Sequence, residues 1–276
     1  MQAGHNVTQA TNSVVAVGIA SAEYNNYVVP RFSGGVSAYS ATGGALSVAS
    51  GRLSYTFAFK GPAVSVDTAC SSSLVATHVA VSNIWSNAAN GGLAAGVGLL
   101  LSPDTTAMFQ KAGMLAADGR CKSMDAAADG YVRGEACGVL RLQELLPGNA
   151  AAGRQAFAVF RASAVNQDGR SSSLTAPNGP SQQDVIRAAL QLGGLRAADI
   201  SHMQLHGTGT PLGDPIELGA AAAVLVDGAQ RALPLANSTA KSWIGHTEAA
   251  AGIMGLTHAA MGLSHQLTQG EIGHCI

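Results

Sequence analysis

Short apolar runs alternate along this chain with segments in which apolar residues have helical spacing. In the first half of the chain, we predict buried strands from four such runs, at residues 13–20, 64–66, 93–101 and 134–142. Helical spacing predicts a helix in the second half of 34–55 and another from Ser71 onward, with Leu74, Val75 and His78 on one side.

Turn-forming residues separate these elements. Residues 23–32 predict a loop or a short helix, and residues 118–132 predict a polar loop that bears charges. The pair Pro147-Gly148 predicts a break after the fourth strand.

A second series of elements begins near residue 156. Strands are predicted at 157–165, 200–205 and 233–237. Helices are predicted at 181–192, where Ser181 is the expected N-cap, at 214–225, and from about 247. Because strands and helices alternate through both series, we expect a layered α/β fold. We predict two halves, residues 1–150 and 151–276, although the sequence shows no clear repeat.

Composition excludes several classes of protein. The chain has 276 residues, of which 47% are hydrophobic and 11% charged, so a large buried core is expected rather than disorder. Its longest apolar run, 91–101, is far shorter than the ~20 residues that a membrane-spanning helix needs. A membrane span is therefore not expected. The net charge is −1 and no basic cluster occurs, so nucleic-acid binding is not expected either.

The cysteines and histidines lack the spacing of metal ligands. The four cysteines form no CxxC pair, and the eight histidines form no HExxH motif. We therefore expect neither a metal site nor a disulfide framework. The first residues lack a secretory signal, so we expect a cytoplasmic protein with reduced thiols.

Cys70 is the first candidate for chemistry. It lies between the predicted strand at 64–66 and the helix from Ser71, with a bend at 67–69. Such a corner lifts a side chain clear of the sheet, and the helix N-terminus favours a thiolate. A small buried hydrophobic residue is the other interpretation, because free cysteines are commonly buried.

His206 and His246 are the second and third candidates. His206 ends a predicted strand beside a glycine-rich turn that contains Thr208 and Thr210, and His246 opens a helix five residues after Lys241. Each histidine alone also fits a structural role. An α/β fold could bring both to one edge together with Cys70, and one thiol with two imidazoles suits acyl-thioester chemistry.

The segments around these three residues resemble a known family. DTACSSSL contains Cys70, HGTGTPLGDPIE contains His206, and KSWIGHTEAAAG contains His246. They are similar to the signature motifs of β-ketoacyl synthases, specifically the ketosynthase domains of modular type I polyketide synthases. The resemblance extends from about residue 35 to about residue 263.

The resemblance implies a thiolase-like fold, layered α/β/α/β/α, made of two similar halves and forming a homodimer in the complete domain. It implies that Cys70 accepts an acyl group from an acyl carrier protein. His206 and His246 would then assist decarboxylation of a malonyl-type thioester, with Lys241 supporting them. Thr208 and Thr210 would bind the phosphopantetheine arm that holds the substrates, and no bound cofactor is implied.

Departures from the family pattern leave alternatives open. The chain is shorter than the family's before Cys70 and stops before its glycine-phenylalanine-glycine loop, so we expect an internal fragment, truncated at both ends. Two alternatives to a polyketide ketosynthase stay open. The chain could be a piece without turnover that acts as a structural or interaction element, or it could perform the same chemistry in fatty acid synthesis. A thiolase or a hydrolase is disfavoured. Arg133 is expected to form an ion pair with Glu135.

Overall fold

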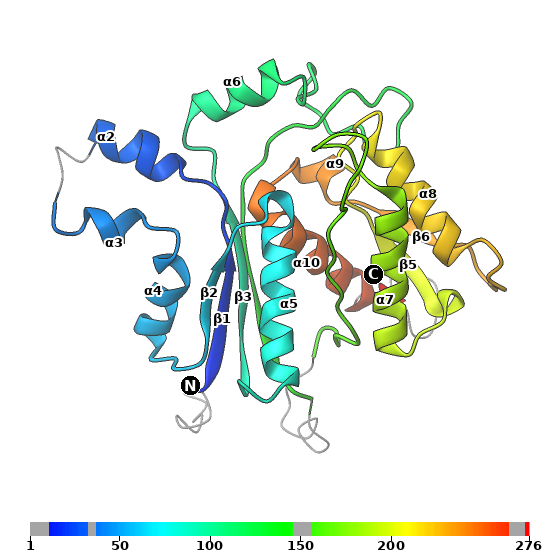
Figure 1. Cartoon of the computed structure of the whole chain (residues 1–276), viewed down its shortest axis with the longest axis horizontal. Coiled ribbons are helices and arrows are strands. Elements are labelled where there is room, and N and C mark those ends of the chain that lie inside the picture. Colours follow the sequence, from blue (N-terminus) through cyan, green and yellow to red (C-terminus); the bar gives the residue numbers. More distant parts are fainter. Residues whose placement is uncertain (1–10, 33–36, 146–155, 265–273, 276) are drawn as a thin grey trace. The chain divides into compact units, whose positions relative to one another are not determined.

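The computed structural model describes residues 11–32, 37–145, 156–264 and 274–275, and these form two compact units with a sheet in each (Figure 1). Unit 1 comprises the described residues within Met1–Met108, Arg133–Gln155 and Thr247–Met254. Unit 2 comprises those within Phe109–Val132, Ala156–His246 and Gly255–Ile276. The chain therefore passes between the units several times.

Unit 1 contains a four-stranded sheet in the order β2-β1-β3-β4. Its strands are β1 (Ser13–Gly18), β2 (Ala63–Val66), β3 (Gly91–Gly98) and β4 (Ala136–Gln143). Strand β1 runs parallel to β2 and β3, and β4 runs antiparallel to β3. All four strands predicted in the first half of the chain are confirmed.

Helices cover both faces of this sheet. Val14 and Ala16 of β1 pack with residues of α5 (Ser72–Trp85). Val15 and Val17 point to the other face and pack with residues of α4 (Val48–Phe57) (Figure 1). Strand β1 is apolar at successive positions because both of its faces are buried, as is typical of parallel strands.

The buried face of α5 differs from the predicted one. Leu74 is 48% exposed, and the buried positions are small residues, namely Ser72, Ser73, Ala76, Thr77, Ala80 and Val81. The reason is the close approach of the helix to β1: a Cβ placed on Gly18 would lie 2.3 Å from the backbone nitrogen of Ser73. Large side chains have no room on that face, so the predicted side with Leu74, Val75 and His78 is wrong.

Shorter elements complete unit 1 and its connections. They are the π-helix η1 (Tyr24–Val28), α2 (Val29–Phe32), α3 (Ser40–Gly44), the 3-10 turns η2 (Ala69–Ser71) and η5 (Glu248–Ala250), and α6 (Pro103–Lys111). The helical form of residues 24–32 agrees with the prediction for 23–32. Residues 118–132 form a loop, as predicted, whereas Pro147-Gly148 lies outside the described residues.

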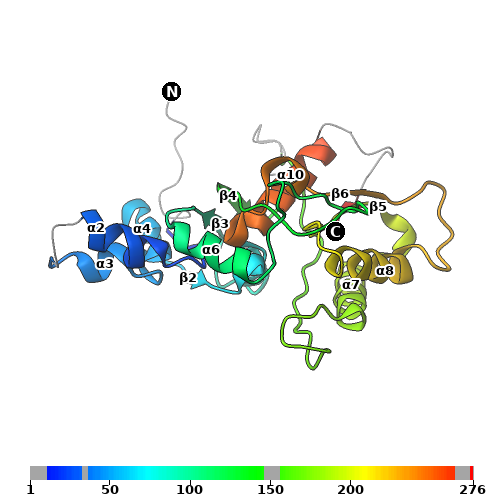
Figure 2. The ribbon, with the colours of Figure 1, turned by 90° about the horizontal axis from the view of Figure 1, so that it is seen from above.

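Unit 2 contains a parallel three-stranded sheet in the order β6-β5-β7. These strands are β5 (Ile200–Gln204), β6 (Ala236–Ser238) and β7 (His274–Cys275). Helices α7 (Gly179–Gly193) and α8 (Gly213–Leu225) lie side by side (Figure 2) and share an apolar core with β5. The remaining elements are η4 (Ala197–Asp199), α9 (Lys241–Ile244) and α10 (Ala251–Ser264), the last of which spans the boundary between the units.

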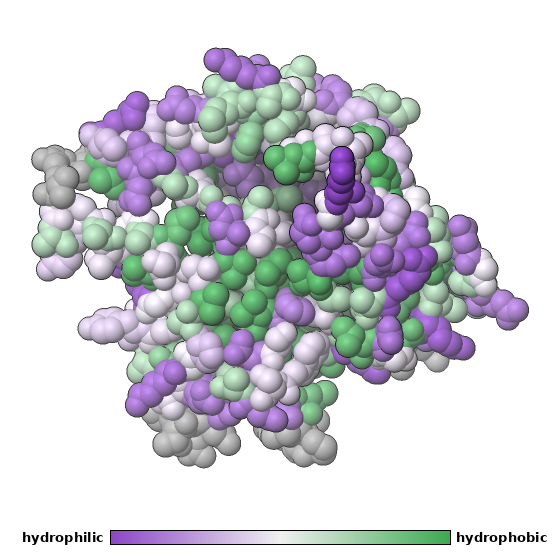
Figure 3. Space-filling model, viewed as in Figure 1, coloured by the Kyte–Doolittle hydropathy of each residue, from purple (hydrophilic) through white to green (hydrophobic). Residues whose placement is uncertain are grey.

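Three predictions for the second half need correction. Residues 157–165 have an apolar pattern but form no strand, because they pair with no strand among the described residues. Phe157 is 80% exposed, and hydrophobic residues also reach the surface on the face shown in Figure 3. Asn178, not Ser181, caps α7, and its side chain accepts a hydrogen bond from the Ser181 N–H. Strand β6 begins three residues later than predicted.

Among the described residues, no helix combines the length and the hydropathy that crossing a lipid bilayer demands.

Candidate active site

Cys70 lies in unit 1 at a corner between strand β2 and helix α5, as predicted. Polar side chains build this corner. Asp67 accepts a hydrogen bond from the Ala69 N–H at 3.0 Å, and the Ser71 hydroxyl donates to the Thr68 carbonyl at 2.8 Å. The sequence DTACSS therefore forms its own tight turn, in which the side chains before and after the cysteine satisfy the backbone.

Close packing restricts this corner further. Ala69 has φ of +55°, a left-handed conformation that costs a residue with a Cβ about 1–2 kcal/mol. Turn η2 contacts η5 within unit 1. A Cβ on Gly252, just after η5, would lie 2.7 Å from the Cβ of Leu74. The half-buried Cys70 is thus held on a turn that has little freedom to shift.

His206 lies in unit 2, two residues after the end of strand β5. A carboxylate on helix α8 holds its backbone: Glu217 accepts hydrogen bonds from the N–H of His206 at 2.6 Å and of Gly207 at 2.9 Å. Burial raises the pKa of Glu217, while these two bonds oppose that rise. The loop that begins at His206 is therefore anchored to the start of α8.

The rest of this loop is anchored by a second carboxylate. Asp214 is buried and accepts hydrogen bonds from the N–H of Gly209 at 3.1 Å and of Met124 at 2.8 Å. The hydroxyls of Thr208 and Thr210 lie 3.1 Å apart within the loop. The two threonines singled out in the sequence therefore share one small polar area beside His206.

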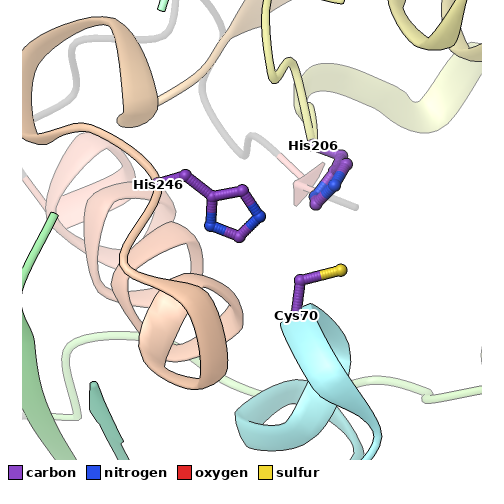
Figure 4. Close-up of side chains that lie close together, drawn as sticks. All are labelled: Cys70, His206 and His246. Atoms are coloured by element: carbon purple, nitrogen blue, oxygen red, sulfur yellow. The ribbon is translucent and has the colours of Figure 1, made fainter. Parts of the chain in front are cut away.

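His246 also lies in unit 2, and its ring faces that of His206 (Figure 4). The two ring centroids are 5.5 Å apart, with the planes nearly perpendicular. The ring of Tyr131 also packs against the His246 ring, with the two centroids 5.0 Å apart. The backbone N–H of His246 donates to the Val132 carbonyl at 2.7 Å. The loop at 118–132 therefore supports His246 with both an aromatic ring and its backbone.

The pKa of both imidazoles is lowered, although His246 is buried and His206 has an exposed surface. Burial, followed by the charge of Lys241, lowers the pKa of His246 to about 3. The pKa of His206 is well below its ordinary value for the same two causes, with His246 adding to them. Lys241 itself is buried at the start of α9. Two neutral rings and one ammonium group thus lie in the same part of unit 2.

The predicted residues are divided between the two units. The structure brings His206, His246 and Lys241 together in unit 2, with Thr208 and Thr210 on the same loop as His206. Figure 4 also shows Cys70 at the start of the ribbon formed by η2 and α5, in unit 1. The meeting of Cys70 with the histidines stays a prediction.

The other cysteines have different surroundings. Cys121 is buried, its sulfur accepts a hydrogen bond from the Val132 N–H, and burial raises the pKa of its thiol. Cys137 is an exposed free thiol on β4. Neither has the polar corner that surrounds Cys70.

Sequence reasoning missed the groups that hold these loops. Arg133 pairs with Glu23 and Glu248 rather than with Glu135, whose carboxylate accepts from the Leu100 N–H. A signal for Glu217 was present, because acidic residues at a helix start commonly bind backbone N–H groups nearby. No spacing in the sequence could indicate Glu23, which lies 110 positions before its partner Arg133.

Comparison with known proteins identifies the family. Residues 2–147 match the family model "Beta-ketoacyl synthase, N-terminal domain", and residues 157–273 match "Beta-ketoacyl synthase, C-terminal domain". The chain is 48% identical over 242 residues to the spectinabilin polyketide synthase system protein NorA' of Streptomyces orinoci, covering 87% of this chain and 7% of that protein. It is 49% identical over 229 residues to erythronolide synthase EryA3 of Saccharopolyspora erythraea, covering 82% and 7%.

Solved structures show the same likeness. The ketosynthase from module 6 of the bacillaene synthase of Bacillus subtilis matches with a TM-score of 0.84 and 36% identity, over 95% of this chain and 45% of that one. The oxazolomycin ketosynthase domain OzmH KS7 of Streptomyces albus matches with a TM-score of 0.83 and 34% identity, over 92% and 44%. These matches confirm the expected thiolase-like α/β fold.

The chain spans less than half of those solved structures and about a tenth or less of the two polyketide synthases. Within that span, two family models cover nearly every residue in the expected order, and the three motifs seen in the sequence lie inside them. The chain belongs to the beta-ketoacyl synthase family.

Proposed function

We propose that the protein containing this chain is a ketosynthase of polyketide biosynthesis that joins an acyl thioester to a malonyl-type thioester with loss of carbon dioxide. The observation that supports this best is the pair of neutral imidazoles, His206 and His246, with ring centroids 5.5 Å apart beside Lys241. Neutral rings can donate N–H hydrogen bonds to a thioester oxygen on which negative charge develops.

In the proposed first step, Cys70 is the nucleophile. Its sulfur forms a bond to the acyl carbon, the bond from that carbon to the carrier's sulfur breaks, and the carrier leaves as a free thiol that has taken the proton of Cys70. The polar turn around Cys70 supports this role, because it presents the side chain at the end of a rigid sheet. Such a fixed attack geometry lowers the entropy lost in reaching the transition state.

In the proposed second step, the histidines act on the malonyl-type thioester. The bond between its carboxylate and the adjacent carbon breaks, carbon dioxide leaves, and the electron pair forms an enolate. His206 and His246 would donate hydrogen bonds to the enolate oxygen, and burial of His246 makes such bonds stronger than they would be in water. Burial and then the charge of Lys241 lower the pKa of both imidazoles, so each ring is neutral near neutral pH and has one N–H to donate.

The third step closes the cycle. The enolate carbon forms a bond to the acyl carbon on Cys70, and the bond from that carbon to the Cys70 sulfur breaks. The Cys70 thiolate that leaves takes a proton from solvent, which restores the thiol. The product is a β-ketoacyl thioester that is two carbons longer. We propose that Thr208 and Thr210 bind the phosphopantetheine arm of an acyl carrier protein, because their hydroxyls lie together beside His206.

Assembly and organisation belong to the same proposal. The complete domain would act as a homodimer, with an N-terminal half to residue 150 and a C-terminal half from residue 151. The relatives named NorA' and EryA3 are polyketide synthases, which favours polyketide over fatty acid synthesis as the pathway.

Mass spectrometry of the intact protein after exposure to an acyl thioester tests this function. We expect one acyl group on Cys70, and none on a Cys70→Ala variant. Cys137→Ala is the matched control, since Cys137 is also a free thiol but lies exposed on β4. Acylation that survives in Cys70→Ala, or free acid released from the wild type at the rate of acylation, would refute the proposal.

A further inference from the structure

A buried ion network surrounds Arg133 in unit 1. Its guanidinium donates to both oxygens of Glu248, to Glu23 at 2.9 Å and to the Thr106 hydroxyl at 2.8 Å. The side chains of Arg133 and Glu23 are only 3% and 6% exposed. Burying charged side chains costs free energy of desolvation unless well-aligned hydrogen bonds offset it. The planar guanidinium of arginine can make such bonds to several partners at once.

The network connects segments that follow the C-terminal ends of parallel strands in the sheet of unit 1. Glu23 follows β1, and its second oxygen accepts hydrogen bonds from the N–H of Leu101 at 2.6 Å and of Ser102 at 2.7 Å, beyond the end of β3. Burial alone would raise the pKa of Glu23, but the bonds from Arg133, Thr105, Leu101 and Ser102 together lower it. Because β1, β2 and β3 are parallel, the turn that contains Cys70, which follows β2, lies at this same edge.

Glu248 is the member that leads from the network to the site. It has φ of +52°, an unfavourable conformation for a residue with a Cβ, and it begins turn η5. Turn η5 contacts η2 within unit 1, and a Cβ on Gly98 would lie 2.4 Å from the carbonyl oxygen of Thr247. Thr247 directly follows His246 in the chain. The ion pair from Arg133 therefore holds a strained residue two positions after one histidine and beside the nucleophile turn.

A backbone hydrogen bond between His246 and Val132 lies next to this ion pair along the chain. Within unit 2, the His246 N–H donates to the carbonyl of Val132, the residue before Arg133. The segment 132–133 thus contacts the segment 246–248 twice, once through the backbone and once through the ion pair. Along the chain, Arg133 directly follows Val132, and Glu248 lies two residues after His246.

We propose that Arg133, acting through Glu23 and Glu248, is a positioning residue for the condensation, one that fixes the main chain after His246 and beside the Cys70 turn without touching substrate. This inference rests on the function proposed above. Three directions of hydrogen bonding are needed at once, so charge alone is not sufficient. Lysine has the charge but lacks the planar fork.

The test compares Arg133→Lys with Arg141→Met in the protein as its gene encodes it. Arg141 is an exposed arginine on β4 and serves as the matched control. The readouts are the single-turnover rate of Cys70 acylation and the rate of carbon dioxide release from a malonyl thioester once Cys70 is acylated. We expect Arg133→Lys to lower carbon dioxide release by about tenfold or more with little change in KM, since a displacement of about 1 Å can cost that much. Arg141→Met should stay within about twofold of the wild type.

A second variant covers the case in which Arg133→Lys does not fold. Glu248→Gln removes the charge from one partner only and leaves the pair of Arg133 with Glu23 intact. A loss of carbon dioxide release in folded Glu248→Gln supports the inference. Either variant with a wild-type rate, or a rate that falls only in proportion to the unfolded fraction, would overturn it.

Amide hydrogen exchange separates this inference from the function itself. If the wild type does not acylate Cys70, the proposed function fails, but the positioning role can still be measured at the His246 amide. We expect Arg133→Lys to speed exchange of that amide by about tenfold, because a weaker ion pair between residue 133 and Glu248 would let the main chain near His246 open locally. The Val15 amide within the sheet should keep its protection. Unchanged exchange at His246 would overturn the positioning role independently of any activity.

Discussion

The turn that contains Cys70 and the loops that contain His206 and His246 are held by different sets of interactions. Around Cys70, glycines allow chain segments to approach so closely that a single methyl group would clash, as at Gly18 and Gly252. Around His206 and His246, the carboxylates of Glu217 and Asp214 and a backbone carbonyl hold the loops by hydrogen bonds. Close packing therefore adds to the local hydrogen bonds of the turn, whereas carboxylates from helix α8 anchor the His206 loop.

This difference has a chemical consequence. A nucleophile must keep one direction of attack, and close packing gives the fewest alternative positions. The imidazoles must also keep a protonation state, and that depends on burial and on the charge of Lys241. Unit 1 should therefore be most sensitive to added volume, and unit 2 to changes of charge and pH.

The largest effect is expected from Gly18→Ala in unit 1. The new Cβ would lie 2.3 Å from the backbone nitrogen of Ser73, and backbone at the start of α5 cannot move without displacing the helix. We expect the free energy of unfolding, measured by urea titration, to fall by about 1–3 kcal/mol or more. Acylation of Cys70 should slow as well, since α5 follows its turn directly.

Gly51→Ala is the control for that substitution. Gly51 lies within helix α4, and a Cβ there would meet no atom within 4 Å. Alanine should instead stabilise the helix by about 0.5–1 kcal/mol, because glycine is the more flexible residue in the unfolded chain. An equal loss of stability in both variants would contradict the steric account of unit 1.

The sequence predicted the elements of the sheets better than the faces of the helices. Strands β1 and β3 were recognisable because both of their faces are buried, which makes the run apolar throughout. The buried face of α5 was not recognisable, since it depends on Gly18 of β1 and Gly96 of β3, which the pattern within the helix does not contain. Residues 157–165 have a strand-like pattern, but a strand also needs a partner with matching register.

The candidate site was predictable to a similar extent. The motifs gave Cys70, His206 and His246, and the structure places Cys70 in turn η2, His206 two residues after β5 and His246 between α9 and η5 rather than at a helix start. The anchors Glu217 and Arg133 were not assigned, because their partners are backbone groups or residues distant in sequence. Position along the chain thus indicated the candidate residues, whereas the groups that hold their loops depend on tertiary contacts.

The next effect is expected in unit 2, as a slope of stability with pH. The pKa of His246 is about 3 in the folded chain, against an ordinary value of 6.5, so between these values the unfolded chain binds a proton that the folded chain does not. The free energy of unfolding should therefore rise as pH increases from about 3 to 6.5, by at most about 1.4 kcal/mol per pH unit from this residue. His246→Asn should reduce that slope in urea titrations between pH 4 and 7.

Two variants show whether that slope belongs to the imidazole. Lys241→Met keeps His246 but removes the second cause of its low pKa, so NMR titration should show the pKa of both histidines rising while burial still holds them below the ordinary value. Gly18→Ala lowers stability in unit 1 and should leave the slope with pH unchanged. A slope in His246→Asn equal to that of the wild type would contradict the electrostatic account of unit 2.

The smallest effect is expected from Ala69→Gly, directly before the nucleophile. Ala69 and Ala58 share φ of +55°, but Ala69 lies in η2, which contacts η5, whereas Ala58 ends helix α4. Glycine relieves the left-handed conformation at both sites, and its greater freedom in the unfolded chain offsets the gain, so each change should be below about 1 kcal/mol. If close packing alone imposes the turn at Cys70, the two substitutions should change the free energy of unfolding equally. A clearly larger gain for Ala69→Gly would mean that the turn stores additional strain, and the acylation rate of that variant would show whether the reaction of Cys70 depends on it.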